Sequence, residues 1–368
     1  MIHTTKKKLQ LLFKKFSYGL FKLFYGRIND FEDISSTSET KVFTSEIDKN
    51  FKYKIYLIRD GRLYTNTVDD AAFIKNNKLL NGPSFQIRNL NFSSIDNNIV
   101  LKNGTPRIQK KLKGKVFSLL SGGAGNYNYW HWLFDILPRL RILSEKKNLS
   151  DIDFFLFPNN NKKFQRETLK ILGIPEKKQL SSLRYRHIKC DEIISTDHPY
   201  VTNNNATSAI QNLPYWIIDW LKSSLTENLN LHDNLFPNKF FIDRGDASES
   251  SSESRKIINE REVVEKLIEH DYKIIRLSNY SFIDQMKLFR NAKKVIGLHG
   301  AGFANIMFSN NNLEILELKP SGAGKMIENL AYKCKVNYDC ISIVPEKYNF
   351  NNQMGHIKVN IKNLVEKL

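Results

Sequence analysis

The chain has 368 residues, which is long enough for two domains of ordinary size, each with its own core. Its formal net charge of +18 at pH 7 favours an anionic partner, such as nucleic acid, acidic lipid or a phosphorylated substrate. The three cysteines, Cys190, Cys334 and Cys340, have no metal-like spacing, and so sparse a set argues against a disulfide framework and for a reducing cytoplasm.

Residues 1–29 form a basic segment with seven Lys or Arg and no acid. Its apolar residues recur at three- and four-residue spacing, which predicts an amphipathic helix. No apolar run approaches the ~20 residues that a bilayer span needs, and Lys14 and Lys15 interrupt any signal-peptide core. We therefore predict a helix that lies on an anionic membrane surface. Its contact residues would be Lys14, Lys15, Phe13, Phe16 and Phe24.

Two other roles of the basic segment can be compared with membrane binding. One stays open: a helix that packs on the protein's own body, with its lysines in solvent. Nucleic acid is disfavoured as the partner, because no zinc-site spacing, RNA-binding sheet signature or basic helix-turn-helix pattern accompanies the charge.

The pattern of expected elements changes at residue 116. Before it, short strands are expected at 53–58, 61–65, 85–87 and 98–102. After it, strands at 116–120, 154–157, 191–194, 239–243, 272–277, 293–297 and 313–318 alternate with helices at 129–146, 161–172, 213–228, 260–270 and 281–291 and a short helix after residue 297. Such alternation predicts βαβ units and a parallel sheet. We expect an α/β fold with two domains, residues 30–228 and 229–368, and a cleft between them.

A glycine-rich loop opens the helix expected at 129–146. The loop includes Gly123, Gly125, Asn126 and Asn128. Such an entry places a helix N-terminus, with its unpaired N–H groups, at a ligand. On the helix, His131 and Asp135 are four residues apart and share a face, and an imidazole held beside a carboxylate works as a general base. The alternative is a packed core histidine, because His131 lies between two tryptophans.

A second glycine turn follows the strand expected at 293–297. Gly300 and Gly302 allow a close approach of the backbone, and a helix start presents N–H groups and a positive dipole end, which suits a diphosphate. The next strand ends in Glu317, where an α/β sheet offers a carboxylate to a ribose hydroxyl. A tight turn without a ligand is the alternative.

Arg244 follows the strand expected at 239–243, and Arg255 lies eleven residues further on. Two guanidinium groups on one loop can grip a diphosphate bidentately, whereas ordinary surface arginine is the alternative. Residues 321–325 lack the spacing of a Walker motif, and neither a metal-binding Asp-x-Asp nor a Gly-x-Ser-x-Gly elbow stands out.

Three segments in this order, within residues 115–320, resemble glycosyltransferase family 61. They are Asn128-Tyr-Trp-His131-Trp-Leu-Phe-Asp135-Ile-Leu-Pro138-Arg139, then Arg244 with Arg255-Lys-Ile-Ile-Asn259-Glu260, and Ile296-Gly-Leu-His299-Gly-Ala-Gly302-Phe-Ala-Asn305. The resemblance implies a GT-B fold of two Rossmann-like domains, with the acceptor side in residues 30–228 and nucleotide-sugar binding in 229–368. It also implies inversion at the anomeric carbon, and bacterial members are similar to capsular polysaccharide biosynthesis proteins.

The resemblance implies roles for individual residues. His131 would be the base that deprotonates the acceptor hydroxyl, oriented by Asp135, and Asp135 itself is the second candidate for the base. The donor, a UDP-sugar, would be a substrate, and no cofactor or metal ion is expected. The donor-binding set would be Arg244, Arg255, Asn259, Glu260, His299, Gly300, Ala301, Gly302, Asn305 and Glu317.

The expected partners follow from the same hypothesis. They are a nucleotide sugar, a glycan or lipid-linked acceptor and an anionic membrane, whereas nucleic acid is not expected and a homo-oligomer stays open. The expected location is the cytoplasm, peripheral on the inner face of the cell membrane. The alternative function is a non-catalytic nucleotide-sugar-binding or scaffold protein of a membrane-associated polysaccharide assembly.

Overall fold

The structure is a computed structural model, and it describes residues 2–67, 70–88, 91–120, 122–123, 128–202, 205–231, 235–245, 255–346 and 352–368. The chain divides into two compact units. The first comprises Met1–Asn161 and Gly173–Ala209, and the second comprises Lys162–Leu172 and Ile210–Leu368. This mixed α/β architecture agrees with the predicted class, and the GT-B arrangement of the two units stays a prediction.

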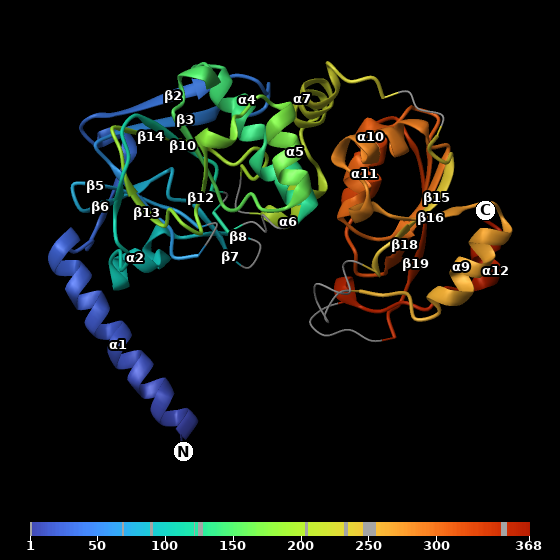
Figure 1. Ribbon diagram of the computed structural model, residues 1–368, viewed down its shortest axis with the longest axis horizontal. Coiled ribbons are helices and arrows are strands. Elements are labelled where there is room, and N and C mark those ends of the chain that lie inside the picture. The colour runs from blue at the N-terminus through green and yellow to red at the C-terminus, as the bar shows by residue number, and fades with distance from the viewer. Residues whose placement is uncertain are drawn as a thin grey trace. The chain divides into compact units, whose positions relative to one another are not determined.

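The second unit is built on one parallel five-stranded sheet in the order β16-β15-β17-β18-β19. Its strands are β15 (Lys239–Asp243), β16 (Lys273–Arg276), β17 (Lys294–Leu298), β18 (Glu314–Pro320) and β19 (Asn337–Ile343). The connecting helices are α9 (Glu260–Glu269), α10 (Phe282–Asn291), the 3₁₀ helix η7 (Ala301–Phe308) and α11 (Met326–Lys333), and α12 (Ile361–Val365) ends the chain. Figure 1 shows α9 and α12 on one face of the sheet and α10 and α11 on the other.

The strands of this sheet are buried on both faces, which is why they read as nearly continuous apolar runs. One core cluster joins strand residues such as Phe241, Ile296 and Leu318 to Leu267 of α9 and Leu364 of α12. On the other face, the ring of Phe240 contacts Phe289 of α10 edge-on. The strands predicted at 239–243, 272–277, 293–297 and 313–318, and the helices predicted at 260–270 and 281–291, are confirmed to within two residues.

Two helices predicted upstream of this sheet also belong to the second unit. Helix α5 (Lys163–Ile171) belongs to the second unit, although the chain before and after it belongs to the first. Helix α7 (Tyr215–Thr226) packs against α5 and η7. The sequence pattern places α7 in the first of the two domains, because it precedes the apparent linker at 229–238. The predicted boundary of the functional domains at residue 228 stays a prediction.

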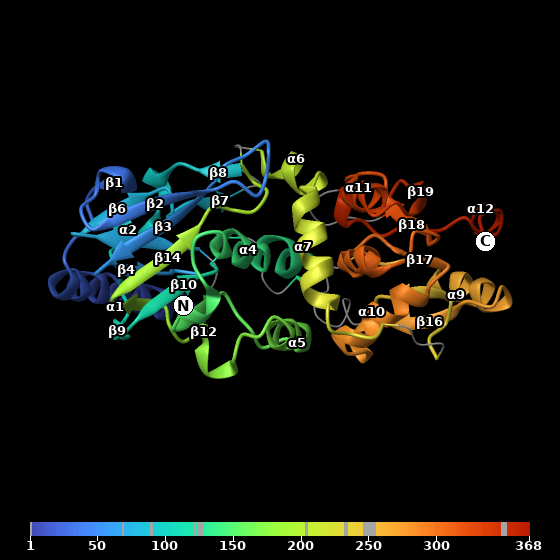
Figure 2. The same ribbon diagram turned by 90° about the horizontal axis from the view of Figure 1, so that it is seen from above.

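The first unit contains two six-stranded mixed sheets and a hairpin (Figure 2). One sheet has the order β1-β6-β5-β4-β13-β9, and its strands are Phe31–Asp33, Lys78–Asn81, Ala72–Lys75, Arg62–Tyr64, His187–Lys189 and Lys110–Lys111. The other has the order β12-β11-β10-β14-β3-β2, and its strands are Gln179–Ser181, Phe154–Phe157, Lys115–Ser118, Glu192–Thr196, Tyr53–Arg59 and Thr40–Ser45. The hairpin pairs β7 (Gln86–Arg88) with β8 (Asn91–Ser93).

The core of the first unit lies between the two six-stranded sheets. Its buried cluster joins Leu63, Phe73 and Ile188 of one sheet to Val116 and Ile193 of the other. Helix α4 (Pro138–Ser144) packs on β14 and β3, and α2 (Ile99–Asn103) supplies Val100 to a smaller cluster on the other sheet.

The strand predicted at 98–102 is wrong, because this segment forms helix α2. Asn98 caps the helix, since its side chain accepts the backbone N–H of Val100, and Gly104 ends it at φ 67°. These N-cap and C-cap residues outweighed the strand preference of the β-branched pair Ile99 and Val100. The strands predicted at 53–58, 61–65, 85–87, 116–120, 154–157 and 191–194 are confirmed to within two residues at each end.

The basic N-terminal segment is helical, as α1 (Ile2–Tyr25), in the structure. Its C-terminal end is docked on the first unit: Lys22 Nζ donates to the carbonyl of Lys102 at 2.8 Å, and the backbone N–H of Gln109 donates to the Tyr25 hydroxyl at 3.0 Å. Ile28, just beyond the helix, is 1% exposed in the core. Among the described residues, no helix is long and apolar enough to cross a membrane.

Candidate functional site

The first unit contains a switch point in its strand order. In the sheet β12-β11-β10-β14, the chain moves from β10 outward to β11 and β12 and then returns to β14 on the other side of β10. All three of these pairings are parallel, so the C-terminal ends of β10 and β14 lie at the same sheet edge. In open α/β sheets, such a point is where ligands bind.

The helix after β10 begins with a side-chain cap. Asn128 accepts the backbone N–H of Trp130 at 2.8 Å, and α3 (Tyr129–His131) runs directly into a π-helical turn, η3 (Trp132–Ile136). The N–H of Leu137 donates to Trp132 O, five residues back, at 3.2 Å. Pro138 lacks an N–H, and its ring clashes with the carbonyl four residues earlier in a regular helix, so the wider turn is favoured here. The helix predicted at 129–146 is confirmed, with this π turn as an addition.

The π turn carries Asp135, whose carboxylate organises a buried polar cluster. Its Oδ2 lies 2.8 Å from His131 Nδ1, and its Oδ1 accepts the hydroxyl of Tyr200 at 2.5 Å. His198 Nε2 lies 3.7 Å from Oδ2, which is longer than a hydrogen bond. Asp135 is 1% exposed, whereas the side chain of His131 is 28% exposed. The structure thus brings the predicted pair together and gives His131 the outer position.

The electrostatics of the cluster keep Asp135 charged. Burial by itself would raise the pKa of Asp135, but its interaction with His131, and the weaker one with the more distant His198, outweigh burial and hold the pKa far below its ordinary value. A charged Asp135 holds the proton of His131 on Nδ1, which leaves Nε2 as the basic nitrogen of the neutral ring. This is the tautomer that a general base needs.

Arg139 joins the helix to both strands of the switch point. It is 0% exposed, and its guanidinium donates to Leu120 O at 2.6 Å, Ser195 Oγ at 3.0 Å and Thr196 O at 2.9 Å. Burial lowers the pKa of Arg139 to about 9, so it remains charged at neutral pH. The same side chain therefore fixes the end of β10, the end of β14 and the helix that carries His131.

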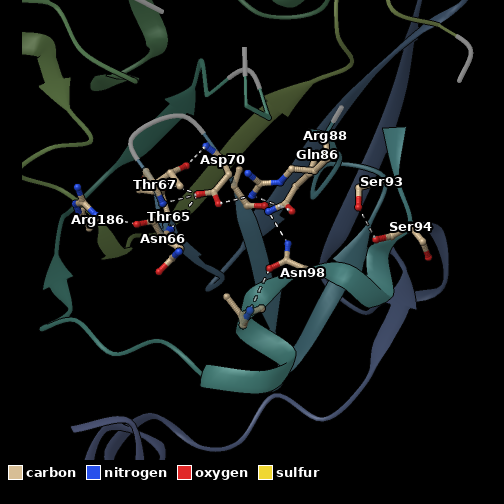
Figure 3. A network of polar contacts seen from close by, with 12 residues as sticks. Thr65, Asn66, Thr67, Asp70, Gln86, Arg88, Ser93, Ser94, Asn98 and Arg186 are labelled. Atoms are coloured by element: carbon tan, nitrogen blue, oxygen red, sulfur yellow. Dashed lines mark hydrogen bonds and ion pairs between the residues drawn. The ribbon is translucent and has the colours of Figure 1, made fainter. Parts of the chain in front are cut away.

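The glycine loop before the helix packs against the β7–β8 hairpin. Gly122 and Gly123 have φ values of 72° and 113°, and a Cβ on either would lie 2.8 Å from the backbone carbonyl of Phe85 or Ile87. The hairpin is braced in turn by Asp70, which accepts Thr65 Oγ1 at 2.8 Å and Arg88 Nη2 at 3.1 Å (Figure 3). Glycine is therefore needed at the predicted position Gly123, because a side chain there would collide with the hairpin. The predicted Gly125 and Asn126 lie outside the described residues.

Sequence reasoning missed two members of this cluster, His198 and Tyr200. Both lie in the segment Asp197-His198-Pro199-Tyr200, directly after β14. A dense run of polar and aromatic residues at the end of a predicted strand was the available signal. Their distance of more than sixty residues from His131 hid the contact, because only the parallel pairing of β10 with β14 brings the segments together.

The second unit has a switch point of its own, between β15 and β17. The chain passes from β15 to β16 on one side and to β17 on the other. Ile242 of β15 is in register with Gly297 of β17, so Arg244 and His299, two residues further along each strand, come side by side at the sheet edge. The predicted donor-binding arginine and the predicted glycine turn thus meet where an α/β sheet binds ligands.

Two arginines converge on one backbone carbonyl there. Arg244 Nη1 and Arg255 Nη1 both donate to His299 O, the latter at 2.8 Å. Among the described residues, Arg255 has no carboxylate within ion-pair distance, and its buried Nε has no hydrogen-bond partner. Burial and then the charge of Arg244 lower the pKa of Arg255 to about 10. A Cβ on Gly300 would lie 2.7 Å from Arg244 Nη1, so a larger residue at this position would displace the guanidinium of Arg244.

His299 and Glu317 form a buried pair below the arginines. His299 Nδ1 contacts Glu317 Oε1, and the hydroxyl of Tyr338 on β19 donates to Glu317 Oε2. Burial lowers the pKa of His299, and the two arginines add to that effect against the opposing charge of Glu317. Glu317 is 0% exposed because β18 continues to Pro320, which places it inside the strand. Both of its oxygens are engaged, and the predicted ribose contact stays a prediction.

The other predicted donor residues lie nearby but serve different contacts. Asn305 Nδ2 donates to Gln285 Oε1 at 3.2 Å and is 0% exposed. Asn259 holds the C-terminal segment through both the N–H and the carbonyl of Val359. Glu260, at the start of α9, is exposed, and Ala301 and Gly302 begin η7. Their roles toward a donor stay predictions. No group of three or more His, Cys, Asp or Glu arranged to hold a metal ion occurs in the described part of the chain.

Comparison with known proteins gives one match. A family model described as glycosyltransferase 61 matches residues 129–316, which is just over half of the chain. The match begins at Tyr129, directly after the Asn128 cap, and ends inside β18, so it contains His131, Arg139, Arg244, Arg255 and His299. No curated protein matches the chain significantly.

Proposed function

The chain belongs to glycosyltransferase family 61, and from this membership we propose that it transfers a sugar, with inversion, from a UDP-sugar to a hydroxyl of a growing surface polysaccharide of the capsular type. In a single displacement, the acceptor oxygen bonds to the anomeric carbon while the bond from that carbon to the diphosphate breaks. The acceptor's proton passes to a base, and the electron pair leaves with the nucleoside diphosphate. The resemblance of the motifs and the geometry of the two switch points support this proposal.

The observation that carries the proposal is the contact between His131 and Asp135 at the sheet edge. A charged, buried carboxylate at 2.8 Å fixes Nδ1 as the protonated nitrogen, and the partly exposed ring then offers Nε2 to a hydroxyl. Asp135 is the weaker candidate for the base, because it is buried and both of its oxygens already accept hydrogen bonds. We therefore assign the base to His131 and its orientation to Asp135.

Donor binding is assigned to the second unit. Arg244 and Arg255 place two guanidinium groups at one point of the sheet edge, and a diphosphate would supply the direct ion-pair partner that Arg255 lacks among the described residues. These fixed positive charges would also stabilise the charge that develops on the leaving diphosphate. No metal ion is needed for this step in the proposal.

The test is turnover by the full-length protein. The protein is incubated with a panel of UDP-sugars in EDTA, and release of UDP is measured with and without glycan acceptors. UDP release that depends on one sugar supports a glycosyltransferase. Binding of a UDP-sugar without any turnover would instead support the non-catalytic alternative, a nucleotide-sugar-binding or scaffold protein of a polysaccharide assembly.

We also propose that α1 holds the protein on the inner face of the cell membrane. Phe21 and Tyr25 face the body, where their rings stack and Tyr25 contacts His187 edge-on. The opposite side of the helix, an arc of about 120° at 3.6 residues per turn, carries only large apolar side chains in its described part. These are Leu12, Phe13, Phe16, Leu20, Leu23 and Phe24, which are between 40% and 85% exposed. The apolar face is therefore not the face that packs on the body.

An anionic lipid surface fits this helix, because Lys14 and Lys15 are exposed on it and the first 29 residues contain no acid. Changing Phe13, Phe16 and Phe24 to Ser should reduce binding to phosphatidylglycerol vesicles at least tenfold, since a buried Phe contributes about 1.5–3 kcal/mol. Changing Lys14 and Lys15 to Gln should weaken binding only at low salt, at about 1 kcal/mol per charge. Co-sedimentation with vesicles measures both effects.

The matched control for this prediction lies in the second unit, where Ile268, Tyr332 and Val344 are also strongly exposed. Their change to Ser should leave vesicle binding unchanged. Deletion of residues 1–28 is a poor test, because it would remove Tyr25 and the buried Ile28 and so disturb the core. If the Phe variant binds vesicles as the wild type does, the membrane assignment is wrong.

A further inference from the structure

We propose that Tyr200 is the positioning residue of the His131–Asp135 pair. Its hydroxyl holds one oxygen of the Asp135 carboxylate, so that the other oxygen faces His131 Nδ1, and it sets how strongly His131 attracts a proton. The inference rests on the proposed function only in treating His131 as the base. The contact itself is a property of the protein without substrate, and it is tested as such.

The segment that carries Tyr200 is held rigidly. His198 Nδ1 accepts the backbone N–H groups of Tyr200 at 3.4 Å and Val201 at 3.1 Å, which fixes the turn after β14. Tyr53 Oη donates to the carbonyl of Pro199 at 2.8 Å from the neighbouring strand. Tyr200 itself is 6% exposed, and its ring contacts His198 edge-on. Its hydroxyl therefore has a fixed position relative to Asp135.

The two oxygens of the Asp135 carboxylate are divided between two partners. Tyr200 takes Oδ1, His131 takes Oδ2, and Asp135 is too deeply buried for water to replace either of them. Burial, and then the adjacent carboxylate, raise the pKa of Tyr200 far above its ordinary value, so its hydroxyl always donates. Hydrogen bonds to a charged group are the strong ones, so the loss of this donor should be felt at His131.

The second unit repeats this connectivity. Tyr338 Oη donates to one oxygen of Glu317, and the other oxygen contacts His299 Nδ1. Each unit thus links Tyr, carboxylate and His in the same order, although the residues come from different elements. The exposure of the ring differs, because His299 is 2% exposed and His131 is the accessible one. The repetition supports a shared purpose, the fixing of an imidazole by a tethered carboxylate.

The direction of the expected effect follows from the groups around Asp135. The helix of Asp135 itself carries His131 and the charged Arg139. The segment after β14 contributes His198, Tyr200 and the partly buried Asp197. Burial lowers the pKa of His198, so this ring stays neutral at pH 7. Without the Tyr200 hydroxyl, the charged Asp135 carboxylate loses one of the hydrogen-bond donors that stabilise its negative charge. Asp135 then stabilises the protonated form of His131 more strongly, which raises the pKa of His131.

The experiment compares Tyr200→Phe with Tyr53→Phe in the full-length protein. Each variant loses one hydroxyl from the same neighbourhood, but Tyr53 donates to Pro199 O and not to Asp135. The pKa of His131 is read by NMR titration of ¹³C- and ¹⁵N-labelled histidine, and its signal is assigned by its loss in His131→Gln. We expect an upward shift on the order of half a unit to one unit in Tyr200→Phe. We expect no shift of the His131 pKa in Tyr53→Phe. The melting temperatures of the two variants should fall by similar amounts, because each loses one hydroxyl.

Turnover gives the second reading. Tyr200→Phe should lower kcat by roughly tenfold to a hundredfold through misplacement of the base, with unchanged KM for the donor, and the acid limb of the pH profile should move to higher pH. An unchanged His131 pKa in Tyr200→Phe, or equal shifts in both variants, overturns the positioning role. If no UDP-sugar is turned over, the proposed function fails, while the titration still decides this inference.

Discussion

His131→Ala should lower turnover by about 10²–10⁴-fold while the affinity for the UDP-sugar stays at the wild-type value. A general base acts in the transition state, so its loss reduces kcat and leaves ground-state binding of the donor intact. The side chain of His131 is 28% exposed and lies at the outer side of Asp135, so its removal takes away little buried packing, although Asp135 loses one of its hydrogen-bond partners. Initial rates of UDP release, with donor Kd from calorimetry, separate the two quantities.

The matched control is His270→Ala. His270 lies at the end of α9 in the second unit, where its Nδ1 contacts the carbonyl of Lys266 and the chain turns toward the start of β16. This variant should keep wild-type turnover. If His131→Ala also turns over at a near wild-type rate while folded, the base is not His131, and the second candidate, Asp135, would have to act despite its burial.

Arg244→Ala and Arg255→Ala should each weaken donor binding by about 1.5–3 kcal/mol, which is roughly ten- to a hundredfold in Kd. Both guanidinium groups converge on His299 O, and Arg255 is half-buried without a carboxylate at ion-pair distance among the described residues. If the two arginines bind the diphosphate, as proposed, the loss should also appear with UDP alone and should be smaller with uridine. Calorimetry in EDTA measures all three ligands.

Arg261→Ala is the control for the two arginine variants, because Arg261 is 91% exposed on α9 and pairs only with Glu265 in the described structure. Its donor affinity should equal that of the wild type. If donor affinity is unchanged in both Arg244→Ala and Arg255→Ala, these two residues do not bind the donor. Binding of UDP that requires Mg²⁺ or Mn²⁺ would contradict the metal-independent part of the proposal.

The elements that position the sites were predictable from the sequence, because each has a local signal. Ser281 caps α10 through the N–H of Asp284, as its position before an amphipathic run indicates. The buried strand at 154–157 is an unbroken apolar run and is confirmed residue for residue. Segment 98–102 was predicted wrongly because its capping residues and its β-branched residues favour different structures, and the sequence alone does not weigh them against packing.

Pairs close in sequence were also predictable. His131 and Asp135 share a helix face at four-residue spacing, and their contact in the structure follows from that spacing even through the π turn. The α1 helix and its apolar stripe have the same local origin. The sequence did not show which side of α1 faces the body, because both Tyr25 and the exposed Phe24 are aromatic. The contacts of Tyr25 with Gln109 and His187 distinguish them in the structure.

By itself, the sequence determined the α/β class, the positions of most strands and helices, and the residue types that point to a glycosyltransferase. Only the tertiary structure decided which of these residues meet. Tyr200 reaches Asp135 because β14 pairs with β10, and Arg244 reaches His299 because the register of β15 with β17 places the ends of these strands at one edge. The physical reason is that helix and strand signals act over a few residues, whereas strand order and register are set by the burial of whole sheet faces.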